Sequence, residues 1–81
     1  MSDKTTDESV LRKITRLVEE EQALYAREPM NDQARARVAE LTVELDQCWD
    51  LLRQRRALRE FGQDPDQAKV RPASVVEKYE Q

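Results

Sequence analysis

The chain has 81 residues, of which 38% are hydrophobic and 38% are charged, and its formal net charge is −3. A chain of this length forms one small domain, and a negative balance argues against a general nucleic-acid coat and against a polybasic membrane binder. This small number of apolar residues is not expected to supply a self-contained core. The chain is therefore predicted to need another protein or a second copy of itself, with a dimer favoured.

The compartment follows from two simple features. The single cysteine cannot form an intrachain disulfide, which fits a reducing compartment. No apolar run is long enough for a signal peptide or a membrane span. The sequence therefore predicts a cytoplasmic protein that does not associate with membranes.

A first helix is predicted over about residues 6–28. Thr5 is followed three residues later by Glu8, which is the spacing of a capping box, so Thr5 is the predicted N-cap. Pro29 should end the helix, because a proline disfavours helical geometry in the residue before it. Apolar residues recur at spacings of three and four, as on one face of a helix: Val10, Leu11, Ile14, Leu17, Val18, Leu24 and Tyr25.

A second, longer helix is predicted over about residues 32–61, with Asn31 or Asp32 as its N-cap and Gly62 as its stop. The short turn before it places the two helices antiparallel and adjacent. A heptad repeat marks its packing side: Ala34, Val38, Leu41, Leu45, Cys48, Leu52, Arg55 and Arg59. The predicted fold is all-α, an antiparallel two-helix hairpin in a single domain that assembles as a dimeric bundle.

The second helix is longer than the first. In the antiparallel register, residues 55–61 are expected to extend beyond the start of the first helix, with no partner there. The tail, residues 62–81, is predicted to dock on this end, in the same subunit or in a partner's, and to cover Leu58 and Phe61.

The tail itself has two helical signals. Asp64-Pro65-Asp66-Gln67 predicts one helical turn, with a cap and a proline at the first position. Ser74-Val75-Val76-Glu77 predicts a short terminal helix with Val75, Val76 and Tyr79 on one face. A tail without ordered structure is the alternative.

A distinctive string, LDQCWDLLRQRR, occupies residues 45–56 and is followed by Phe61-Gly62, Asp64-Pro65-Asp66 and Val70-Arg71-Pro72. These residues resemble a family of small actinobacterial proteins catalogued as domain of unknown function 2630. The resemblance covers nearly the whole chain. It implies a short, soluble, helical protein of the bacterial cytoplasm, and it implies no activity and no catalytic or binding residues.

The residue types argue against catalysis. The chain has no histidine, so the commonest general base and metal ligand is absent. One cysteine without a second cysteine or a histidine makes neither a catalytic triad nor a zinc site, and a single glycine excludes the usual Gly-rich phosphate loops. The sequence predicts no enzyme, no cofactor, no metal and no small-molecule substrate.

Two residues of the second helix have alternative interpretations. Cys48 lies on the apolar stripe and is interpreted as a small buried hydrophobe; the alternative is a redox-sensitive thiol at an oligomer interface. Trp49, near Val10 and Leu11 in the predicted register, is either a core residue or an interface anchor. The residues predicted to contact a protein partner are of the types found at binding hot spots: Trp49, Leu52, Leu58, Phe61 and Tyr79.

Four arginines, Arg53, Arg55, Arg56 and Arg59, cluster at the end of the second helix. Helical spacing puts Arg53 and Arg56 on one side and Arg55 and Arg59 on another. In the structural interpretation they complement the helix dipole and pair with the nearby acids Asp50, Glu60, Asp64 and Asp66. In the functional interpretation they bind an acidic protein patch or a nucleic-acid backbone.

These observations favour a non-enzymatic protein–protein interaction or regulatory module. The alternative is a nucleic-acid or nucleoprotein accessory factor that uses the arginine cluster at residues 53–59 on phosphates.

Overall fold

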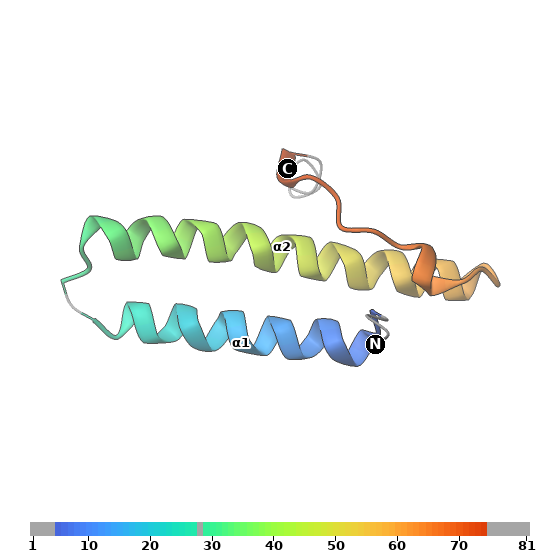
Figure 1. The fold of residues 1–81 in the computed structure, drawn as a ribbon, viewed down its shortest axis with the longest axis horizontal. Helices are drawn as coiled ribbons and strands as arrows, with labels where there is room; N and C mark the ends of the chain where they lie inside the picture. The colour runs from blue at the N-terminus through green and yellow to red at the C-terminus, as the bar shows by residue number, and fades with distance from the viewer. Residues whose placement is uncertain (1–4, 28, 75–81) are drawn as a thin grey trace.

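The computed structural model describes residues 5–27 and 29–74. Two helices, α1 (Asp7–Tyr25) and α2 (Asp32–Glu60), lie side by side and antiparallel, and a short 3-10 helix, η1 (Pro65–Gln67), follows them (Figure 1). Both α1 and η1 pack against α2, and the described part of the chain contains no strand. The predicted all-α hairpin is confirmed.

The start of α1 differs from the prediction by one residue. Thr6, not Thr5, is the N-cap: its Oγ1 accepts a hydrogen bond from the Ser9 backbone N at 3.0 Å, and Ser9 Oγ accepts one from the Thr6 N at 2.9 Å. The prediction was ambiguous because each threonine has a polar side chain three residues later, Glu8 or Ser9. Capping by Thr6 leaves Asp7 in the first turn, where it contacts α2.

The connection between the helices begins earlier than predicted. α1 ends at Tyr25 rather than near residue 28: the Ala26 N–H donates to the Gln22 carbonyl oxygen at 3.0 Å, and the Arg27 N–H donates to that of Leu24 at 3.2 Å. α2 starts after Asn31, whose side chain accepts a hydrogen bond from the Ala34 N at 2.8 Å. A short connection of this kind forces the two helices to pack against each other.

The hydrophobic core lies between the two helices. Val10, Ile14 and Leu17 of α1 pack against Leu41, Cys48 and Leu51 of α2. Leu51 does not belong to the predicted heptad repeat. It is buried because the core of α2 is wider than the heptad stripe near the tail. Partly buried residues complete the core: Val18, Leu24, Leu45, Leu52 and Ala68.

The tail reverses direction after α2. Gly62 has a φ of +73°, a left-handed conformation that glycine adopts without strain, and the Gln63 N–H reaches the Leu58 carbonyl oxygen at 2.7 Å. Asp64 then caps η1 by accepting a hydrogen bond from the Asp66 N at 2.9 Å. The chain runs back along α2, on the side away from α1 (Figure 1).

One expectation about the end of α2 is wrong. The residues beyond position 54 do have partners from α1, because Asp7 binds Arg55 and Arg59. Phe61 is 79% exposed and Leu58 is half-buried. The predicted terminal helix with Val75, Val76 and Tyr79 lies outside the described residues.

Candidate functional site

Arg55 is the most buried arginine of the cluster, with 5% exposure. Its Nε donates to Oδ1 of Asp7 at 2.7 Å, and its Nη1 donates to Oδ1 of Asp66 at 3.1 Å and to the Pro65 carbonyl oxygen at 3.3 Å. A buried guanidinium is tolerated when acceptors surround it. Arg55 thus joins the start of α1 and η1 to α2.

Arg59 binds the same carboxylate. Its Nη2 lies 2.8 Å from Oδ2 of Asp7, and its Nη1 donates to Oδ1 at 3.1 Å. The hydrogen bonds from Arg59 and Arg55 lower the pKa of Asp7 below its ordinary value, because they stabilise the ionised carboxylate. The hydrogen bond that Arg55 donates to Asp7 raises the pKa of Arg55 in turn.

The other two arginines lie at the surface. Arg56 Nε donates to Glu60 Oε1 at 3.2 Å, and both side chains are exposed. Arg53 is exposed as well, with its Nη2 4.0 Å from Oδ1 of Asp50. The structure therefore brings Arg55 and Arg59 together on Asp7 of α1, whereas the acids beside Arg53 and Arg56 belong to α2 itself.

A second polar cluster, centred on Asp50, holds the tail. Asp50 is 1% exposed, and its two carboxylate oxygens accept hydrogen bonds from Arg71 Nη2 at 2.7 Å and Nε at 2.9 Å. Gln54 Nε2 donates to Asp50 Oδ2 at 2.9 Å and to the Lys69 carbonyl oxygen at 2.8 Å. Gln47 Nε2 donates to the Arg71 carbonyl oxygen at 3.1 Å.

Sequence reasoning did not single out this second cluster. Gln47, Asp50 and Gln54 are spaced by three and four residues, so they share one side of α2. This polar stripe was the available signal. It could not be matched to the tail without knowing that the chain runs back along α2.

An apolar face lies on one side of the hairpin. Glu20 of α1 binds Arg37 of α2 at 2.6 Å and so marks the opposite side. Helical spacing puts Leu11, Val18 and Tyr25 of α1 on the other side of the buried stripe. Four apolar residues of α2 lie on that same side: Val38, Leu45, Trp49 and Leu52. We define the apolar face as Leu11, Val18, Tyr25, Val38, Leu45, Trp49 and Leu52.

The apolar face is only partly covered. Leu11 is 47% exposed, Trp49 is 46% exposed and Tyr25 is also exposed, whereas the other members are half-buried. Among the predicted partner-contacting residues, Trp49 and Leu52 lie on this face. Leu58 and Phe61 lie near the end of α2 towards the tail, and Tyr79 is outside the described residues.

Cys48 packs in the core as a free, buried thiol. Burial raises the pKa of the thiol, because the thiolate loses its hydration. A raised pKa lowers the fraction of reactive thiolate. The geometry favours the interpretation of Cys48 as a small hydrophobe.

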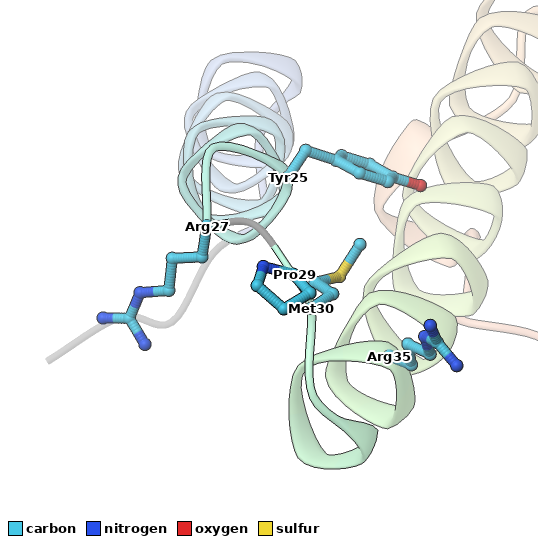
Figure 2. Close-up of a pocket in the computed structure, with 5 residues that line it drawn as sticks. All are labelled: Tyr25, Arg27, Pro29, Met30 and Arg35. Carbon is cyan, nitrogen blue, oxygen red and sulfur yellow. The ribbon is translucent and has the colours of Figure 1, made fainter.

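An open hollow lies at the hairpin turn, lined by Tyr25, Arg27, Pro29, Met30 and Arg35 (Figure 2). The Tyr25 ring points from α1 towards α2, Met30 lies below it, and Arg27 points away. The charged side chains among these described residues are those of Arg27 and Arg35.

Within residues 5–27 and 29–74, no three His, Cys, Asp or Glu side chains gather as a metal site. Neither of the two long helices described has an apolar stretch that would carry it across a bilayer.

The family model described as "Protein of unknown function (DUF2630)" matches residues 6–81. The chain belongs to this family. The resemblance stated from the sequence is therefore confirmed.

Mycobacterial relatives match along nearly their whole length. They include the uncharacterized proteins Rv0898c of Mycobacterium tuberculosis (strain H37Rv) and Mb0922c of Mycobacterium bovis. Each is 49% identical over 80 residues, which is 94% of this chain and 92% of the relative. No solved structure matches the chain significantly.

Proposed function

We propose that this DUF2630 protein is a non-enzymatic protein-interaction or regulatory module of the cytoplasm. Its apolar face binds a second copy of the chain, which gives a homodimeric, coiled-coil-like four-helix bundle. The observation that carries the proposal is the exposure of Trp49 and Leu11, 46% and 47%, at the same level of the hairpin.

Exposure of one leucine needs no explanation, but a continuous apolar face does. Tryptophan is among the residue types that contribute most at protein interfaces, especially when apolar neighbours surround it. Trp49 has such neighbours in the half-buried Leu45 and Leu52. Covering this face would add the apolar burial that a short, highly charged chain lacks.

Charge complementarity favours a second copy as the occupant. Helical spacing puts Glu8 at the edge of the apolar face on α1, and puts Arg53 and Arg56 at its edge on α2, at the same end of the hairpin. A two-fold axis parallel to the helices sets α1 of one protomer on α2 of its partner. Glu8 then meets Arg53 and Arg56 of the other copy, so the surface complements itself.

The competing hypothesis uses the arginine cluster to bind nucleic acid. Arg55 and Arg59 bind Asp7, and Arg56 binds Glu60, so a phosphate backbone would compete with carboxylates of the same chain for three of the four arginines. This supports the interaction module over the nucleic-acid factor. The salt dependence of RNA or DNA affinity would measure how far the arginines contribute to nucleic-acid binding.

The test is sedimentation equilibrium of the full chain across a wide concentration range, with Trp49 fluorescence on the same samples. We expect a dimer, and an indole emission that shifts to shorter wavelength as the dimer forms, because association removes Trp49 from water. Trp49→Ala and Leu11→Gln should each weaken dimerisation at least about tenfold, with little loss of helicity by circular dichroism.

Phe61→Ala is the matched control, because Phe61 is an exposed aromatic outside the apolar face. It should dimerise like the wild type. A chain that stays monomeric at all concentrations, or a dimer indifferent to both face variants, contradicts the proposal. Salt-sensitive RNA binding that is lost in Arg56→Ala would favour the nucleic-acid factor instead.

A further inference from the structure

The segment from Ala68 to Arg71 lies along α2 in an arrangement that resembles peptide recognition. Its hydrogen bonds with side chains of α2 are made by one polar stripe, Gln47, Asp50 and Gln54. The stripe therefore binds the tail as a surface binds an extended peptide.

Two of the three contacts recognise backbone. Gln54 accepts from the Lys69 N at 3.5 Å through Oε1 and donates to the Lys69 carbonyl oxygen at 2.8 Å through Nε2. Gln47 donates to the Arg71 carbonyl oxygen at 3.1 Å. Residues 69 and 71 alternate along an extended chain and so face the same way. These contacts select an extended conformation and not a side chain.

The third contact recognises a side chain. Asp50 accepts two hydrogen bonds from the Arg71 guanidinium and a third from Gln54, which orients the carboxylate. The carboxylate is 1% exposed. A buried carboxylate bound at both oxygens fits the fork of arginine and not the single ammonium of lysine.

The tail is held with little apolar burial. Ala68 is the residue of this segment that packs against the core, and Val70 is 61% exposed. Lys69 and Pro72 are exposed too. A segment with few buried apolar contacts opens at a lower free energy than the helices it covers.

We propose that the stripe of Gln47, Asp50 and Gln54 is a binding site for an extended, arginine-containing peptide, which the chain's own residues 68–71 occupy. The partner is a segment of another protein with an arginine that binds Asp50. Two residues before this arginine, the backbone N–H and carbonyl of the segment are free to bind Gln54. The tail competes with this partner for the site. The proposal is independent of dimerisation through the apolar face.

The test uses a fluorescein-labelled peptide of residues 67–74, QAKVRPAS, titrated with full-length protein and followed by fluorescence anisotropy. In Arg71→Ala the chain's own tail lacks the guanidinium, so the site should accept the peptide at least about tenfold more tightly than in the wild type. A peptide with lysine in place of arginine should bind Arg71→Ala at least about tenfold more weakly.

Two variants control for nonspecific attraction. Adding Asp50→Asn to Arg71→Ala should abolish binding, because the acceptor of the guanidinium is lost. Arg53→Ala, which removes an exposed arginine 4.0 Å from the same carboxylate, should behave like the wild type. Equal binding to Arg71→Ala and to the double variant, or no binding to either, overturns the proposal.

A second measurement does not depend on a variant that might lose its fold. In the wild type, the Arg71 Nε–H signal in a nitrogen–proton NMR spectrum should move when excess unlabelled peptide displaces the tail. The signal should stay in place with the lysine peptide. An unmoved signal at saturating arginine peptide also overturns the proposal.

Discussion

Asp7, the first residue of α1, accepts a hydrogen bond from Arg55 of α2 at 2.7 Å, across 48 positions of sequence. The same guanidinium also bonds Asp66 beside the end of α2. One buried side chain therefore connects three segments that are distant in sequence. Ordinary surface ion pairs contribute little to stability, but removing a partner from a buried one leaves charges without compensation.

Replacement of Arg55 by alanine should destabilise the hairpin by about 2 kcal/mol. This is less than for a fully buried pair, because Asp7 and Asp66 are partly exposed and regain water. Arg56→Ala is the matched control: its pair with Glu60 is exposed, so the loss should stay within about 0.5 kcal/mol. Urea unfolding measures both, and equal losses would contradict a special role for Arg55.

Stability should fall in acid partly through Asp7. The pKa of Asp7 is lowered in the folded state from its ordinary value of 3.8, chiefly by the hydrogen bond from Arg59 and then by that from Arg55. The unfolded state therefore takes up the proton at a higher pH than the folded state does. The contribution of Asp7 to the free energy of unfolding is complete above pH 3.8 and is lost as the pH falls through the lower, folded-state pKa.

The acid effect can be assigned with Asp7→Asn. Urea midpoints measured from pH 7 down to pH 2.5 should decline less steeply in the variant than in the wild type, since asparagine does not titrate over this range. Parallel declines would show that other carboxylates carry the acid sensitivity.

The N-cap of α1 provides a paired comparison of adjacent threonines. Thr6→Ala should cost about 1 kcal/mol, because it removes the acceptor of the Ser9 N–H. Thr5→Ala should change stability by less than about 0.5 kcal/mol, since Thr5 is exposed and precedes the cap. The reverse order in urea unfolding would restore Thr5 as the capping residue.

Cys48 should react slowly with thiol reagents in the native state. Because the thiol is buried and its pKa is raised, the native protein should react at least about tenfold more slowly than the urea-unfolded protein. An absorbance assay with an aromatic disulfide measures both rates. Equal rates would revive the interpretation of Cys48 as an exposed redox-sensitive thiol.

Local patterns were sufficient to predict the two helices. Apolar spacings of three and four define both packing stripes, Asn31 caps α2, and Gly62 adopts the left-handed conformation predicted after it. Asp64 likewise caps the predicted turn as η1. These features depend on residues within one or two turns of each other, which sequence spacing reports directly.

Long-range polar partners were not predictable in the same way. Asp7 suits a helix N-terminus by itself, so nothing local pointed to Arg55. Asp50 is on the side of α2 opposite the apolar stripe and would face solvent in an isolated hairpin. It is buried because the tail returns over it and supplies Arg71, a tertiary event that no local spacing encodes.

The short connection between Tyr25 and Asp32 also bears on the order of folding. Contacts beside it, such as those of Leu24 with the core, close small loops, whereas the Asp7–Arg55 contact spans 48 positions. Loop closure costs more entropy as the loop grows, so the hairpin is expected to zip from this connection towards its open end. Interactions made late in folding slow unfolding without speeding folding. Arg55 would then determine how long the native hairpin persists, and not how quickly it forms.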